Sequence, residues 1–224
     1  ALRHEKRAYG AEFPPDRARV VTASADATAR IWNRAGEIVR VLDHPQWVTW
    51  ATFAPDGEHV VTTCWDDKVR LWRADGEMVR VMEHAVTPRQ CAVSPDGRLI
   101  ASVANSGLRV WRWDGTLVVK DRLHSTSTYS VAFAGDGQRL VTGSSDGTAR
   151  IWDLDGTELA VLPCGSGVLA TRFSPDGRHV LTGAAGGAVR LWCADPEDLL
   201  RVVDGKLARG FTKEERARFA DLLD

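Results

Sequence analysis

The chain has 224 residues, of which 29 are basic and 30 acidic, and its formal net charge is −1. This balance lacks the basic excess that phosphate backbones and anionic membranes attract, so we expect neither nucleic acid nor a membrane as a partner. The apolar runs are a few residues long, far short of the roughly 20 that span a bilayer. No secretory signal pattern opens the sequence, and we expect a cytoplasmic protein.

The cysteines predict neither a metal centre nor a disulfide framework. None belongs to a Cys-x-x-Cys pair, and they fall at unlike places along the chain, at Cys64, Cys91, Cys164 and Cys193. Without metal-ligand spacing or a paired framework, we expect reduced thiols and no metal. The sequence indicates no cofactor.

A repeat of about 40 residues organises the chain. One of its marks is an aspartate in a turn, which recurs at Asp16, Asp56, Asp96, Asp136 and Asp176. The other is a tryptophan at nearly the same spacing, at Trp32, Trp72, Trp111, Trp152 and Trp192. Self-similarity at this period indicates one supersecondary unit per copy, and each unit must stack on its neighbours to bury a core.

Each copy alternates short β-rich runs with turns that contain Asp and Gly, as between Leu140 and Leu162. Such runs predict four antiparallel strands per copy, and no copy has the helical apolar period that a βαβ unit would need. In chain order the predicted units are residues 4–42, 43–82, 83–123, 124–162 and 163–204, which form one all-β domain over residues 1–204. Residues 205–224 leave the repeat and predict a short helix with Thr212 as its N-cap.

The fourth copy carries the motif that identifies the repeat. Its His124, the turn 143–147 and the triplet Ile151-Trp152-Asp153 resemble the signature of WD repeats. The resemblance implies a β-propeller with five blades in this chain, in which Trp, Ser, His and Asp form a buried hydrogen-bond chain in each blade. The implied members are His4, Ser24, Asp26, Trp32, His44, Asp66, Trp72, His84, Trp111, His124, Ser144, Asp146, Trp152 and Trp192.

Three copies depart from this pattern. In the second copy Cys64 occupies the serine position. The third copy is one residue short, and its Ser and Asp positions are assigned to Val103 and Asn105. The fifth copy has other residues at the His, Ser and Asp positions, namely Cys164, Ala184 and Gly186. We therefore expect the fifth copy to have the loosest turns.

Two other patterns resemble functional sites. Ser, His and Asp within one copy suggest a catalytic triad, but an enzyme needs one activated serine with one oxyanion hole, whereas this set recurs. We interpret the set as structural and expect no enzyme. A row of arginines suggests a phosphate-binding stripe, but alternation places it on a strand face, which favours packing and local charge pairing. The row is Arg30, Arg70, Arg109, Arg150 and Arg190.

The WD resemblance also implies a partner site on one end of the propeller, which we term the top face. Its contact positions lie three and five residues after the histidine and one residue before the turn aspartate. The positions that carry interface-type residues, with a neighbouring threonine, are Arg7, Tyr9, Trp47, Thr49, Trp65, Arg89 and Tyr129. Because Trp, Tyr and Arg dominate interface energies, we predict a protein or peptide site centred on Trp47 and Trp65. The alternative is that one or both tryptophans pack inward between blades.

Two functions remain open at this stage. The tail contains Leu207-Ala208-Arg209, Phe211-Thr212 and Glu214-Glu215, and it is similar to the endings of bacterial WD-repeat sensors attached to STAND-type signalling NTPases. That resemblance implies a sensor module regulating an effector domain upstream on the same polypeptide. The second possibility is a constitutive scaffold subunit of a multiprotein complex. Propellers of this family usually have seven blades, so whether five close into a ring is also open.

Overall fold

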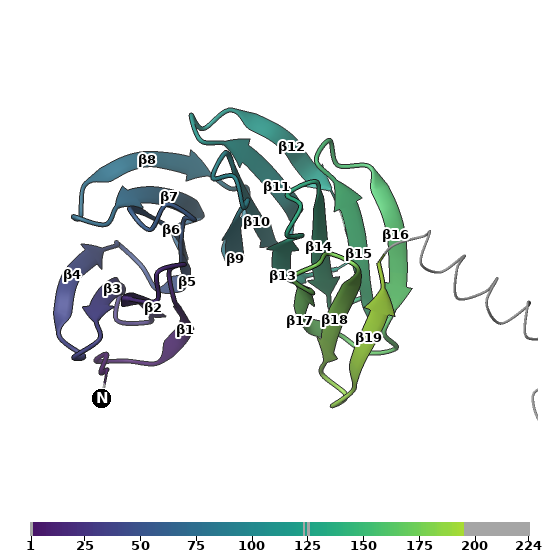
Figure 1. Ribbon diagram of the computed structural model, residues 1–224, viewed down its shortest axis with the longest axis horizontal. Helices are drawn as coiled ribbons and strands as arrows, with labels where there is room; N and C mark the ends of the chain where they lie inside the picture. Colours follow the sequence, from purple (N-terminus) through teal and green to yellow (C-terminus); the bar gives the residue numbers. More distant parts are fainter. Residues whose placement is uncertain (1, 123, 125, 195–224) are drawn as a thin grey trace, which may run out of the picture.

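A computed structural model describes residues 2–122, 124 and 126–194 of the chain. These residues form five antiparallel sheets (Figure 1), numbered here in chain order. The first sheet contains β1 (Ala8–Glu12), β2 (Arg19–Ser24), β3 (Thr28–Asn33) and β4 (Ile38–Asp43). The second contains β5 (Val48–Phe53), β6 (His59–Cys64), β7 (Lys68–Arg73) and β8 (Met78–Glu83).

The third sheet contains β9 (Pro88–Val93), β10 (Leu99–Ala104), β11 (Gly107–Arg112) and β12 (Leu117–Arg122). The fourth contains β13 (Thr128–Phe133), β14 (Arg139–Ser144), β15 (Thr148–Asp153) and β16 (Glu158–Pro163). The fifth contains β17 (Val168–Phe173), β18 (His179–Ala184) and β19 (Val189–Cys193). Within each sheet every strand pairs with the next along the chain, so the all-β prediction is confirmed.

Two parts of the sequence prediction lie outside the described residues. They are the fourth strand of the fifth copy, which the repeat predicts before residue 204, and the helix predicted over 205–224. Within the described part of the chain, no helix has the length and apolar character needed to cross a membrane.

The five sheets form an arc around a common centre (Figure 1). The first strands of neighbouring sheets lie against one another on its inner side, β1 against β5, β5 against β9, β9 against β13 and β13 against β17. The outermost strands are β4, β8, β12 and β16. As described, the sheets do not close into a ring, because the first and fifth sheets stand at the two ends of the arc (Figure 1).

The hydrophobic core consists of four clusters, each shared by two successive sheets. Between the second and third sheets, for example, Val69 and Leu71 of β7 pack with Ile100 of β10 and Trp111 of β11. The equivalent residues make the cores between the first and second, third and fourth, and fourth and fifth sheets. From the second sheet onward, each repeat tryptophan therefore packs toward the preceding sheet, which explains why a single copy cannot bury its own core.

The third sheet shows where its missing residue lies. Its β10–β11 hairpin pairs Ala104 directly with Gly107, whereas the second sheet pairs Cys64 with Lys68 across a longer turn. Gly107 has a φ of 105°, a conformation that favours glycine. The sequence alignment placed the gap differently, so the prediction that Val103 and Asn105 occupy the Ser and Asp positions is wrong. Ala104 and Ser106 hold those positions.

Candidate functional site

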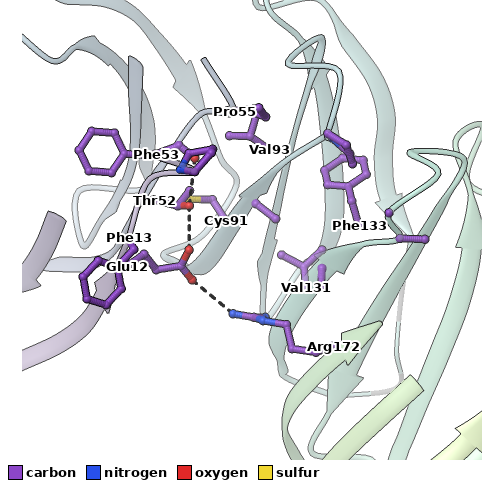
Figure 2. Close-up of a pocket in the computed structure, with 16 residues that line it drawn as sticks. Glu12, Phe13, Thr52, Phe53, Pro55, Cys91, Val93, Val131, Phe133 and Arg172 are labelled. Carbon is purple, nitrogen blue, oxygen red and sulfur yellow. Dashed lines mark hydrogen bonds and ion pairs between the residues drawn. The ribbon is translucent and has the colours of Figure 1, made fainter. Parts of the chain in front are cut away.

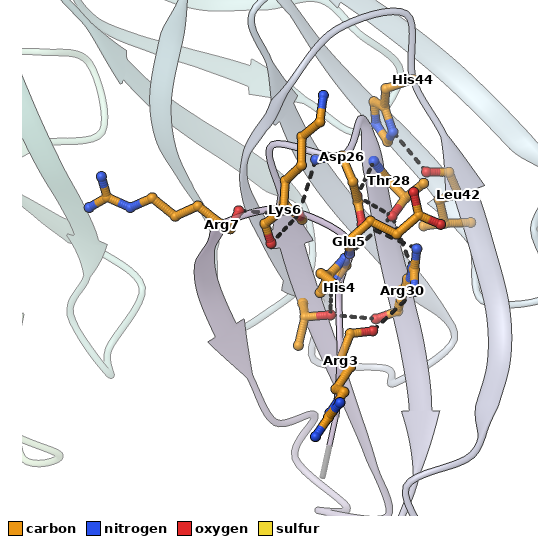
Figure 3. A network of polar contacts seen from close by, with 12 residues as sticks. Arg3, His4, Glu5, Lys6, Arg7, Asp26, Thr28, Arg30, Leu42 and His44 are labelled. Carbon is orange, nitrogen blue, oxygen red and sulfur yellow. Dashed lines mark hydrogen bonds and ion pairs between the residues drawn. The ribbon is translucent and has the colours of Figure 1, made fainter.

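The first sheet contains a buried hydrogen-bond chain that begins at Trp32. Figure 3 shows the part of this network around His4 and Asp26. The Trp32 indole N–H donates to Thr22 Oγ1 at 2.8 Å, and Thr22 Oγ1 lies 2.6 Å from His4 Nε2. On its other side, His4 Nδ1 lies 2.8 Å from the carboxylate of Asp26. Because a carboxylate only accepts hydrogen bonds, Nδ1 carries the proton and Nε2 accepts from the threonine hydroxyl.

The hydroxyl in this chain belongs to a threonine, so the predicted role of Ser24 is wrong. Ser24 Oγ donates to the carbonyl of Arg7 at 3.1 Å and accepts the N–H of Asp26 at 3.1 Å, which ties the β2–β3 turn to the loop before β1. Thr22 and Ser24 share one face of β2 because they are two residues apart, but the indole N–H of Trp32 bonds only to Thr22. The sequence pattern alone cannot distinguish the two hydroxyls.

The fourth sheet repeats this arrangement and requires the same correction. Trp152 donates to Thr142 Oγ1 at 2.8 Å, His124 Nε2 lies 2.7 Å from that hydroxyl, and His124 Nδ1 lies 3.1 Å from Asp146. The predicted member Ser144 instead donates to the carbonyl of Ser127. Ser24 and Ser144 are completely buried and bond backbone groups, so in these two sheets the Ser-His-Asp resemblance to a triad has no corresponding geometry.

The second sheet keeps the hydroxyl and reorients its histidine. Trp72 donates to Thr62 Oγ1 at 2.9 Å, and His44 Nε2 lies 2.8 Å from it, so Cys64 does not interrupt the chain. His44 Nδ1 donates to the carbonyl of Leu42 at 2.9 Å, while the predicted partner Asp66 binds Arg70. Burial lowers the pKa of His44 to about 4 and raises the pKa of the Cys64 thiol to about 11.

The same network stabilises the charged form of Asp26 in the first sheet. Burial by itself would raise the pKa of Asp26, but hydrogen bonds from Thr28 and His4 outweigh it and hold that pKa well below its ordinary value. Arg30 also lies 3.1 Å from the Asp26 carboxylate. These groups keep the β2–β3 turn and the preceding loop in one conformation, because each buried polar atom has a partner.

The third and fifth sheets hold reduced versions of the chain. In the third, Ser106 Oγ lies 3.4 Å from His84 Nδ1, at the position that aspartate holds in the first sheet. In the fifth, Trp192 donates to Thr182 Oγ1 at 2.9 Å, and Cys164 Sγ lies 3.6 Å from that hydroxyl in place of a histidine.

The arginine row pairs locally, as the packing interpretation predicted. Arg30 and Arg70 each bind the aspartate four residues earlier, and Arg150 lies 2.7 Å from Glu158. Arg109 and Arg190 donate to backbone carbonyls at the start of the connecting loops. The row is therefore part of each sheet's own hydrogen bonding.

The two central residues of the predicted partner site lie side by side on the top face. The ring centroids of Trp47 and Trp65 are 4.7 Å apart with an interplanar angle of 36°. The backbone N–H of Trp65 donates to the backbone carbonyl of Trp47 at 2.9 Å, so this bond fixes the positions of the two residues. Trp47 is 38% exposed and Trp65 53% exposed, and the alternative that they pack inward is wrong.

A third tryptophan in this region does pack inward. Trp50 of β5 lies against Gly10 of β1, where any Cβ would come within 2.9 Å of the Trp50 ring. The two first strands therefore approach closely only because residue 10 is glycine.

Two arginine–aromatic pairs complete the top face. The Arg89 guanidinium carbon lies 4.9 Å from the centre of the Tyr129 ring, and Arg89 Nε donates to Asn105 Oδ1 at 3.3 Å. Arg7 lies over Tyr9 at 5.3 Å. Thr49 is held by the carbonyl of Pro88 at 2.7 Å, which links the second and third sheets.

Comparison with known proteins assigns the family. The family model described as WD domain, G-beta repeat matches five segments, at residues 2–33, 36–73, 76–112, 113–153 and 156–193. The chain belongs to the WD-repeat family. A segment of 48 residues is 40% identical to Periodic tryptophan protein 2 of Saccharomyces cerevisiae. A segment of 47 residues is 40% identical to the homologue of that protein in Dictyostelium discoideum. Each match covers about a fifth of this chain and 5% of the relative, so the likeness concerns one repeat.

The predicted contact residues of this WD-repeat chain surround two hollows of about 500 Å³ each. Tyr9, Thr49 and Arg89 line both hollows, Trp65 lines the outer one, and Tyr129 lines the one over the centre of the arc. Trp47 joins the site by stacking on Trp65, and Arg7 joins it through Tyr9. All seven predicted contact residues thus lie in one region of the first four sheets.

The residues of this region that sequence reasoning missed include Val86, Gln90, Asn105 and Arg172. Asn105 directly precedes Ser106, so it is the counterpart of Trp65, and correct placement of the gap would have found it. The other three lie outside the contact positions of the repeat, and no signal in one sequence distinguishes them.

A third cavity, of about 380 Å³, lies deeper between the first strands (Figure 2). Arg172 of β17 lies 3.3 Å from Glu12 of β1, and Thr52 of β5 donates to the same carboxylate at 3.1 Å. The remaining lining residues shown are mostly apolar, including Phe53, Val93 and Phe133 (Figure 2). This ion pair joins the two end sheets of the arc across its centre.

Proposed function

We propose that this WD-repeat chain is a protein- or peptide-binding module that acts as the sensor or regulatory part of a larger bacterial signalling or defence protein. WD propellers bind protein partners, and the surface that would bind a partner here is the top face of the second and third sheets. The observation that carries the proposal is the exposed, backbone-fixed pair Trp47 and Trp65 beside the hollow lined by Arg89.

The physical argument rests on how binding energy concentrates. Buried tryptophan, tyrosine and arginine supply most of the affinity of typical interfaces, with about 2 kcal/mol or more at each central residue. Here the stacked tryptophans and the two arginine–tyrosine pairs are ordered before a partner arrives, so little side-chain entropy would be lost on binding. An open surface with these residues fits a folded partner or an extended peptide.

The sensor role rests on the tail, residues 205–224, whose sequence is similar to the endings of bacterial WD-repeat sensors. In this proposal the effector domain lies elsewhere on the same polypeptide, and the propeller contributes recognition without chemistry of its own. A constitutive scaffold would use the same surface but would hold its partner under all conditions.

The test uses crosslinking in cells that express the protein containing this chain. It compares the wild type, the double variant Trp47→Ala/Trp65→Ala and the control Phe13→Ala, an aromatic residue that is more exposed than either tryptophan and lines the deeper cavity. We expect one crosslinked partner in the wild type and control and its loss in the double variant. A partner retained by the double variant would refute the site, and a partner bound in every growth condition would favour the scaffold.

A further inference from the structure

The two arginines of the top face differ from those arginines of the chain that carboxylates neutralise. Elsewhere, Arg19, Arg30, Arg70, Arg139 and Arg150 pair with carboxylates at distances of 4 Å or less. Among the described residues, Arg7 and Arg89 pair with no carboxylate, and aromatic rings hold their guanidinium groups instead. Two positive charges on this face are therefore positioned but not neutralised.

Nearby carboxylates are already engaged. Asp67 accepts a hydrogen bond from Thr87 Oγ1 at 2.8 Å, and Glu12 lies in the deeper cavity with Thr52 and Arg172. Glu12 and Thr52 line that deeper cavity, while Arg172 lines both it and the inner hollow. Neither Asp67 nor Glu12 pairs with Arg89, so no ion pair within the described residues neutralises its charge.

The hollows around Arg89 also present hydrogen-bond donors. Arg89 uses Nε for Asn105, which leaves the two terminal nitrogens of a planar fork directed away from that bond. Trp50 also lines the inner hollow, but its indole N–H is buried and so is not counted among these donors. The planar guanidinium fork of Arg89 suits a carboxylate, which only accepts.

The tryptophan pair argues against a cationic ligand. Cages for methylated ammonium groups enclose the cation between several ring faces, whereas Trp47 and Trp65 stack on each other at an interplanar angle of 36°. A basic side chain would also meet Arg89 in the same hollow and be repelled. The free face of Trp65 suits an apolar or aromatic side chain.

Resting on the proposed function, we infer that the partner presents an extended segment with an Asp or Glu side chain for Arg89 and an apolar or aromatic side chain for Trp65. Both residues line the hollow of about 500 Å³, so the two ligand side chains belong to neighbouring positions of one segment. The occupant is an acidic peptide segment of a protein partner.

The experiment selects short random peptides displayed at the N-terminus of a phage coat protein, which excludes binding through a free C-terminal carboxylate. Four baits are compared: the wild-type chain, Arg89→Gln, Trp47→Ala/Trp65→Ala, and Arg98→Gln as a control. Arg98 is exposed and lines a different hollow, in the third sheet. Circular dichroism and a melting curve establish that each variant is folded before selection.

We expect peptides selected by the wild type and by Arg98→Gln to be enriched in Asp or Glu next to an apolar residue. The acidic enrichment disappears with Arg89→Gln, while the apolar enrichment remains. A selected peptide, synthesised, binds Arg89→Gln about tenfold more weakly than wild type, as expected for loss of one charge-assisted hydrogen bond. Its affinity for the wild type also falls at high salt.

Other outcomes distinguish this inference from the proposed function. Peptides that require the two tryptophans for binding, but that are basic or lack Asp and Glu, would overturn the inference and leave the proposed function standing. An unchanged affinity for Arg89→Gln would also overturn it. If the wild type selects no peptide that the double tryptophan variant fails to select, both the inference and the proposed site fail.

Discussion

The second and fifth sheets contain the same tetrapeptide in opposite environments. Val-Arg-Leu-Trp occupies residues 69–72 in β7 and residues 189–192 in β19. Leu71 is completely buried while Leu191 is 67% exposed, and Val69 is completely buried while Val189 is 70% exposed. The third sheet covers the first pair, whereas no described sheet covers the second (Figure 1). Burial in this fold is therefore decided by the neighbouring sheet and not by the repeat's own sequence.

The same two sheets also differ on the top face. Where the second sheet has Trp47 and Trp65, the fifth has Gly167 and Ala185, although the backbone bond between the two positions is present in both. The hydrogen-bond framework is thus shared, and the exposed positions it supports vary freely. The repeat therefore supplies a common backbone framework, and individual sheets differ in the side chains that they present for binding.

The largest expected effect comes from truncating the matched leucines. Leu71→Ala should lower the free energy of unfolding by about 3 kcal/mol, because it leaves a cavity in the core between the second and third sheets. Leu191→Ala should change it by no more than about 0.5 kcal/mol, because the side chain is largely exposed. Urea denaturation followed by tryptophan fluorescence measures both. Equal losses would mean that the face of the fifth sheet is covered in solution.

An intermediate effect should follow from removing the threonine hydroxyls. Thr62→Val leaves both Trp72 Nε1 and His44 Nε2 without their buried partner and should cost about 2 kcal/mol. Thr182→Val should cost about half as much, because Trp192 is partly exposed and the other partner is the weakly bonding thiol of Cys164. The same denaturation assay applies. A larger loss for Thr182→Val would contradict the ranking of the two networks.

The smallest effect is a dependence on pH that the second sheet should show and the fifth should not. The folded pKa of His44 is about 4 and the unfolded value about 6.5, so the unfolded chain binds more protons between these limits and stability falls as pH falls. Between about pH 7 and about pH 5.5 this group should contribute a loss of about 1 kcal/mol. The fifth sheet has Cys164 at the position of this histidine and therefore no imidazole there.

Unfolding of the wild type and of His44→Gln at several pH values isolates this contribution. The variant should lose less stability on acidification than the wild type, whatever its stability at neutral pH. Cys164→Ala, the matched control in the fifth sheet, should leave the slope unchanged. Identical slopes for the wild type and His44→Gln would contradict the assignment of a neutral, buried His44.

The sequence predicted the sheets well because turn aspartates and buried tryptophans repeat with one period. It left the exposure of Trp47 and Trp65 open, because local sequence does not show whether a tryptophan packs inward between blades, as Trp50 does. It failed on the hydroxyl of the buried chain, because Thr22 and Ser24 share a strand face and differ only in level. The sequence could not place the gap in the third copy, because only the strand register shows that Ala104 and Ser106 hold the Ser and Asp positions.

The most direct test of the account follows the indole N–H signals of the nine tryptophans by nuclear magnetic resonance while a selected acidic peptide is added. Each signal is assigned with single Trp→Phe variants. The account predicts that the signals of Trp47 and Trp65 shift and saturate, while those of Trp32, Trp72 and Trp152 stay fixed in their bonds to threonine. Saturable shifts confined to other tryptophans, with Trp47 and Trp65 unchanged, would contradict the top-face site.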